Sequence, residues 1–105
     1  MKNDRSFLEF VEDLRKRPGM YLGAKSITRL HLFILGWSYG NENIPEIGVF
    51  HDFVQWVRLY YKYNEYSPQS WANIILFHSI DENEALDQFF NLFDKFLAER
   101  NDGIS

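Results

Sequence analysis

Three histidines have the widest chemical range in this chain, because imidazole serves both as a metal ligand and as a general base. His31, His51 and His78 are 20 and 27 residues apart, and no two have the spacing that places a pair of imidazoles on one helical face. His51 and Asp52 are adjacent, so on a helix their side chains diverge by about a hundred degrees. The histidines predict neither a metal site nor a His–Asp catalytic pair, and we interpret them as surface or helix-capping residues.

Nucleophiles are equally scarce. The chain has no cysteine, which excludes disulfides, thiolate metal sites and cysteine nucleophiles. Its serines occur in neither a Gly-x-Ser-x-Gly nor a Ser-x-x-Lys pattern. Ser26, Ser67 and Ser70 stand where helices are expected to begin, and helix capping explains them.

A carboxylate cluster is formed by Asp81, Glu82, Glu84 and Asp87. Paired carboxylates can perform acid–base chemistry, but acids in the first turn of a helix are also favoured by the helix dipole alone. We therefore interpret the cluster as a binding feature rather than a catalytic one. The sequence predicts no enzyme, no cofactor and no metal.

The most distinctive string is RKRPGMYLG, residues 15–23. We expect Pro18-Gly19 to stop the first helix and the rest to form a loop, with Gly19 and Gly23 permitting the turns and residues 20–22 as an apolar plug. The string resembles the RPGMYIG segment of the ATPase domain of type II topoisomerases (the gyrase B class), which lies near the nucleotide pocket. The Asp-x-Gly-x-Gly motif and glycine-rich lid of that family are absent, so a nucleotide-binding fragment is only a remote alternative. Whether the string is structural or part of an interface stays open.

Length and composition indicate one globular domain, residues 1–105. Hydrophobic residues make up 46% of the chain and aromatic residues 18%, which is enough for a dense core. Ten Phe, six Tyr and three Trp exceed what five short helices need, so some rings should be exposed at an interface.

Charge is unevenly divided along the chain. Residues 1–40 hold seven basic and four acidic side chains, a net charge of +3, and residues 41–105 hold four basic and eleven acidic ones, a net charge of −7. This division predicts an acidic C-terminal surface, which repels nucleic acid and attracts a basic partner.

The N-terminus is interrupted by charges and does not read as a signal peptide. The apolar runs at residues 30–37 and 74–77 are far too short to cross a bilayer. We expect a cytoplasmic protein with no membrane contact.

Apolar residues recur at helical spacing in five segments, which predicts an all-α fold: a compact single-domain bundle of about five short helices. The predicted apolar faces are Phe7, Phe10, Val11 and Leu14; Ile27, Leu30, Ile34 and Trp37; Phe50, Phe53, Val54, Val57, Tyr60 and Tyr61; Trp71, Ile74, Ile75 and His78; and Ala85, Leu86, Phe89, Phe93, Phe96 and Leu97. A less favoured alternative places strands in residues 59–66, because aromatic residues also suit strands.

Local start and stop residues set the expected limits of these helices. Capping boxes are predicted from Ser6 with Glu9 and from Asp81 with Glu84, and Ser26 is the expected N-cap of the second helix. Ser67-Pro68 is expected to start the fourth. Residues 41–48 should form a loop, the third helix should end near Tyr63, and residues 101–105 should fray.

A second resemblance spans nearly the whole chain and depends on the order of several blocks. These are RPGMYLG followed by Lys25-Ser26, then Phe50-His51-Asp52-Phe53-Val54, Ser70-Trp71, Ile74-Ile75-Leu76, Asp81-Glu82, and a terminal helix with Phe89-Phe90, Phe93-Asp94 and Phe96. In length, in lacking cysteine and in this order, the chain is similar to small bacterial immunity proteins of polymorphic and contact-dependent growth inhibition toxin systems. The resemblance implies tight binding to a cognate toxin domain, which in such systems is frequently a nuclease.

This function is compatible with the charge pattern, because a ribonuclease toxin must be basic where it holds phosphates. The hypothesis makes Glu42, Glu46, Asp81, Glu82, Glu84 and Asp87 the expected electrostatic contacts, and Tyr60, Tyr63 and Tyr66 the possible aromatic anchors. For each of these residues, a solvated acidic face or a packed tyrosine is the simpler alternative. A helical adaptor or regulatory protein-binding domain unrelated to toxins is the alternative function.

Overall fold

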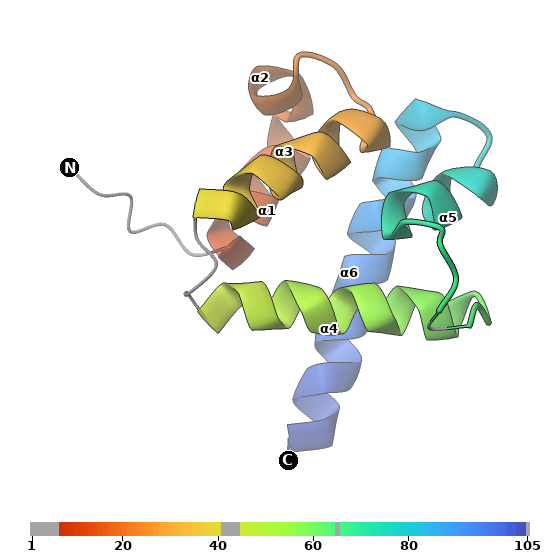
Figure 1. The fold of residues 1–105 in the computed structure, drawn as a ribbon. Helices are drawn as coiled ribbons and strands as arrows, with labels where there is room; N and C mark the ends of the chain where they lie inside the picture. The colour runs from red at the N-terminus through yellow and green to blue at the C-terminus, as the bar shows by residue number, and fades with distance from the viewer. Residues whose placement is uncertain (1–6, 41–44, 65, 105) are drawn as a thin grey trace.

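A computed structural model describes residues 7–40, 45–64 and 66–104 of the chain; at positions 45, 46 and 101–104 it describes the backbone only. The described residues form six helices and no strand, which confirms the all-α prediction (Figure 1). The helices are α1 (Phe7–Lys16), α2 (Pro18–Leu22), α3 (Ile27–Gly40), α4 (Pro45–Tyr60), α5 (Trp71–Phe77) and α6 (Glu82–Ile104). Among them, none combines the length and apolar character needed to cross a membrane.

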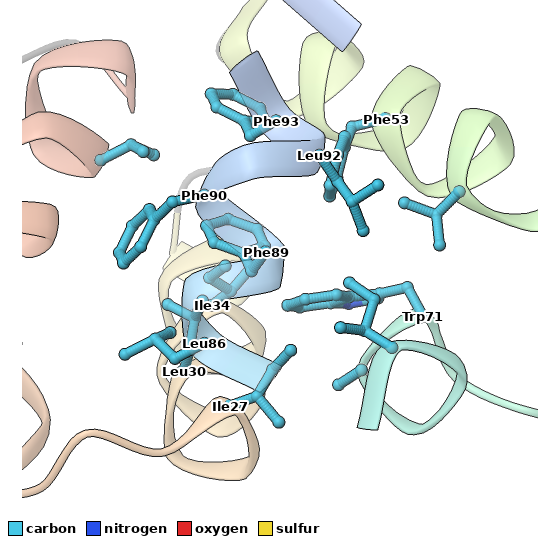
Figure 2. Packing of buried hydrophobic residues seen from close by; sticks show 14 of the residues in the cluster. Ile27, Leu30, Ile34, Phe53, Trp71, Leu86, Phe89, Phe90, Leu92 and Phe93 are labelled. Atoms are coloured by element: carbon cyan, nitrogen blue, oxygen red, sulfur yellow. The ribbon is translucent and has the colours of Figure 1, made fainter. Parts of the chain in front are cut away.

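The long helix α6 organises the fold. It contacts α3, α4 and α5, and α4 crosses it while α1, α2 and α3 gather to one side (Figure 1). The residues predicted for its apolar face are buried, except for Leu97, which is partly exposed. In Figure 2, Phe89, Phe90 and Phe93 project from α6 among side chains from the neighbouring helices.

Aromatic rings fill the centre of the core. Phe53 of α4 is fully buried and its ring lies edge-on to those of Phe89, Phe93 and Phe96, with centroids 5.1 to 5.5 Å apart. Trp71 at the start of α5 packs edge-on against Phe50, 5.4 Å away. Such edge-to-face pairs add stability beyond the area that they bury.

One predicted helix start has its expected capping bond, and a second has one of the two bonds expected of its capping box. The Ser26 hydroxyl accepts a hydrogen bond from the Arg29 amide at 3.2 Å, so Ser26 caps α3. Asp81 Oδ1 accepts from the Glu84 amide at 2.8 Å, while Glu84 accepts from the amide of Ile80 rather than from that of Asp81. Ser6 lies outside the described residues.

The predicted start of the fourth helix at Ser67-Pro68 is wrong. The helix begins at Trp71, and Ser70 is its N-cap, with extended backbone angles and a side chain that accepts from the Asn73 amide at 3.1 Å. The Ser67 hydroxyl accepts instead from the Gln69 amide at 3.3 Å, which holds a local turn. Trp71 is the first residue of this stretch with a buried side chain, so packing sets the start of the helix.

Prolines explain two further differences. Pro18 begins α2 instead of a loop, and Pro45 begins α4 inside the segment predicted to be a loop. Proline suits the first helical position because its missing N–H would have no helical partner there. In α2, Leu22 is buried and Tyr21 is partly buried, but Met20 is exposed, so the expected apolar plug is only partly formed.

The ends of α4 and α6 also differ from expectation. Helix α4 ends at Tyr60, because Lys62 adopts a left-handed conformation (φ 64°) and the Tyr63 amide donates back to the Arg58 carbonyl at 2.7 Å. Helix α6 continues to Ile104, through positions expected to fray.

The two glycines of the RPGMYLG string should respond differently to alanine. Gly23 has φ 78°, and a Cβ there would lie 2.8 Å from Arg29 Nη1, whereas Gly19 lies within α2 with open space around it. We expect Gly23→Ala to lower the free energy of unfolding by about 1 to 2 kcal/mol. Gly19→Ala should be neutral or stabilising by up to about 1 kcal/mol. Urea denaturation of the two variants checks this, and equal stabilities would contradict a conformational requirement at Gly23.

Candidate protein-binding surface

The structure describes the side chains of seven of the nine residues predicted to bind a partner. Glu42 lies outside the described residues. Glu46 belongs to α4, where the structure describes its backbone but not its side chain. The other seven divide between two regions of the fold. The acids Asp81, Glu82, Glu84 and Asp87 lie at the start of α6, whereas Tyr60 ends α4 and Tyr63 and Tyr66 belong to the segment between α4 and α5.

Glu82 is engaged inside the molecule. Its carboxylate accepts hydrogen bonds from the Ser26 hydroxyl at 2.8 Å, the Thr28 amide at 2.9 Å and the Thr28 hydroxyl at 2.6 Å. Partial burial acts to raise the pKa of Glu82, but these hydrogen bonds favour the ionised form and lower the pKa overall. Glu82 thereby joins the first turn of α6 to the first turn of α3.

The fold pairs two of the C-terminal acids with basic residues of the N-terminal part. Asp87 pairs with Lys25 at 2.9 Å, and Asp94 forms a bidentate pair with Arg15, at 2.6 and 3.0 Å. Helix α6 therefore places its acids beside the basic residues of the N-terminal half. A separate acidic face does not follow from the sequence division alone.

Asp81 ends the turn between α5 and α6, and Glu84 lies in the first turn of α6. Asp81 is exposed and accepts a hydrogen bond from the Glu84 amide, while Glu84 accepts one from the Ile80 amide at 2.6 Å. Ile80 itself is 85% exposed. The junction of α5 and α6 thus carries two carboxylates and a large exposed aliphatic side chain.

A row of aromatic rings crosses from the end of α4 to the end of α5. Tyr60 lies edge-on to Tyr61 (5.0 Å), Tyr61 stacks on His78 (4.4 Å, 6° between planes), and Phe77 and Tyr63 lie edge-on to His78, at 5.2 and 6.2 Å. We call these five residues the aromatic row. Tyr60 also lies under the Lys95 ammonium, 5.5 Å from the ring centroid. The row gives this part of the surface a continuous aromatic character.

A cleft opens beside the aromatic row, with a volume of about 550 Å³. We call it the Tyr63–Phe77 cleft; its lining residues are Tyr63, Gln69, Asn73, Ile74, Leu76 and Phe77. Phe77 is 78% exposed although it is the last residue of α5. Large exposed apolar side chains beside a hollow are typical of sites that bind another molecule.

Of the predicted anchors, only Tyr63 lines the cleft. Tyr60 belongs to the aromatic row, and Tyr66 is exposed in the segment that joins α4 to α5. The predictions missed Phe77, Gln69 and Asn73. Phe77 had a signal in the sequence: it falls off the stripe formed by Trp71, Ile74 and Ile75, and a large ring outside the buried stripe of a short helix points to solvent.

The histidines have separate surroundings. His31 packs edge-on against Trp71 at 5.4 Å, and burial lowers its pKa. His78 belongs to the aromatic row, and His51 is exposed on α4. Among the residues with described placement, no group of three or more His, Asp and Glu side chains could hold a metal ion.

No protein-family model, curated protein or solved structure matches the chain.

Proposed function

We propose that this chain is an immunity protein, which binds a cognate bacterial toxin domain and neutralises it by covering a basic active-site surface. A nuclease is the favoured target, and a ribonuclease in particular. The observation that carries the binding role is the Tyr63–Phe77 cleft with its exposed apolar margin. The order of sequence blocks shared with immunity proteins supports the toxin as partner.

The chemistry of this surface suits a tight inhibitor. Tyrosine and phenylalanine bury large areas and lose little conformational entropy when a partner covers them, so they dominate binding energy at protein interfaces. Asp81 and Glu84 add negative charge at the junction of α5 and α6, where Ile80 is exposed. A nuclease surface that holds phosphates is basic and complements this arrangement.

Association with the toxin domain encoded next to this chain is the direct test. Co-expression should protect cells, and purification should yield a stable one-to-one complex. The association rate should fall as salt rises, since the net charge of −4 attracts a basic partner over a distance. An unrelated basic nuclease of similar size is the control and should neither bind nor be inhibited. Absence of both protection and complex formation would refute the immunity function.

The internal pairing of acids favours one other function, a helical adaptor that binds a protein unrelated to toxins. Asp52, Asp87 and Asp94 are each paired with a basic residue of the chain itself, which reduces the charge available to a partner. An adaptor using the same apolar cleft should bind with little dependence on salt. Measurement of association at low and high salt separates the two functions.

A further inference from the structure

We infer that two copies of this chain associate through the outward face of α3, as an antiparallel helix pair with a two-fold axis between Leu35 and Gly36. This face consists of the residues exposed along one side of the helix: Thr28, Leu32, Leu35, Gly36 and Tyr39. We call it the α3 face. The inference goes beyond the immunity function and does not depend on it.

The α3 face lies on the side of its helix that points away from the core. Ile27, Leu30 and Ile34 are the buried residues of α3, and at about 100° per residue the five positions of the α3 face fall on the other side. Leu32 is 61% exposed and Tyr39 is 80% exposed. Helix α3 is therefore apolar on both sides, whereas a helix that covers a core ordinarily has polar residues outward.

Charge distinguishes the α3 face from the outward side of α6, where Asp87, Asp94 and Lys95 are exposed. The only residue of α3 with a formal charge is Arg29, whose guanidinium donates to the Leu22 carbonyl at 3.0 Å. Two copies of a chain with a net charge of −4 repel each other. At the uncharged α3 face they can approach without placing like charges together.

The order of large and small residues makes the α3 face complementary to itself. About the proposed axis, Leu35 packs on the partner's Gly36 and Leu32 on the partner's Tyr39, and the symmetry makes each contact twice. Gly36 has room for a leucine, because it is exposed and a Cβ built on it meets nothing within 4 Å. A small residue at the centre lets the two helices approach closely. Each large side chain of the face thereby finds an apolar contact in a second copy.

The size of the contact predicts a weak dimer. Helix α3 has 14 residues and is about 21 Å long. One pair of such helices buries less than about 1,200 Å² in total, which is the range of transient complexes. The chain should therefore be monomeric at about 5 µM and largely dimeric at about 500 µM.

Sedimentation of the full chain across this concentration range measures the association, and circular dichroism checks that each variant is folded. Leu32→Glu should lower the association constant about tenfold or more, because its carboxylate would be buried against the partner's Tyr39 without an ionic partner. Leu59→Glu is the matched control, since Leu59 is 74% exposed on α4 and lies outside the α3 face. Its association constant should stay within about twofold of that of the unsubstituted chain, because salt screens a distant charge.

A second substitution tests the antiparallel arrangement. Tyr39→Lys alone should weaken association as Leu32→Glu does, because it also buries an unpaired charge. The double variant Leu32→Glu/Tyr39→Lys places opposite charges against each other at both ends of an antiparallel pair, so association should recover at least about tenfold relative to either single variant. In a parallel pair the same changes would bring like charges together.

Three results would overturn the inference. A monomeric mass across the whole concentration range excludes the dimer. Equal weakening by Leu32→Glu and Leu59→Glu excludes the α3 face as the interface. A double variant that associates no better than the single variants excludes the antiparallel pair about this axis.

Discussion

Replacing Phe53 with alanine should lower the free energy of unfolding by about 3 to 5 kcal/mol, because the change removes a fully buried ring from the centre of the core. The ring contacts those of Phe89, Phe93 and Phe96 on α6, so its loss leaves a cavity between α4 and α6. A domain of this size has a total stability of about 5 to 15 kcal/mol. The substitution should therefore leave a marginally folded protein.

Chemical denaturation followed by circular dichroism measures this loss. Phe77→Ala is the matched control, since it removes the same ring from a side chain that is 78% exposed, and its effect should be no more than about 1 kcal/mol. A similar loss in the two variants would contradict the core position of Phe53.

The second large effect is expected at Glu82. Glu82→Gln should lower the free energy of unfolding by about 1 to 2 kcal/mol at pH 7, because the carboxylate accepts three hydrogen bonds from Ser26 and Thr28, and bonds to an ionised acceptor are the stronger kind. Asp87→Asn is the control. It removes the exposed ion pair with Lys25 and should cost no more than about 1 kcal/mol.

The effect at Glu82 should depend on pH in one direction. The pKa of Glu82 is lowered in the folded protein, so its contribution to stability is fully present above the ordinary carboxyl pKa. The contribution is lost as the pH falls through the lowered pKa. The stability difference between the unsubstituted chain and Glu82→Gln should therefore shrink on acidification below about pH 4.5. A difference that stays constant between pH 7 and pH 3 would contradict the role of the ionised carboxylate.

Helical periodicity predicted much of the fold because it depends on residues close in sequence. Val11, Ile27 and Phe89 repeat with their neighbours at helical spacing and were predicted for the apolar faces of α1, α3 and α6. All three side chains are buried. The helix limits were less accurate. Pro18 and Pro45 suit a loop as well as a first helical turn, and only the surrounding packing decides between them.

The candidate site was harder to predict, because its geometry depends on contacts between distant parts of the chain. Glu82 was expected to face a partner, yet it bonds to Ser26, 56 residues earlier. Similarly, Arg15 and Asp94 are 79 residues apart in sequence. Charge summed along a sequence does not show which charges the fold pairs. The cleft required the segment between α4 and α5 to lie against α5, and Tyr63 alone did not indicate its neighbours.

The place of α6 in the chain has a consequence for synthesis. The ribosome produces residues 82–104 after the five shorter helices, yet Ile27 of α3, Phe53 of α4 and Trp71 of α5 belong to the same buried cluster as the rings of α6. Until α6 has been synthesised, these side chains lack the surface that covers them, so the core that the four helices share cannot be complete before residues 82–104 are available.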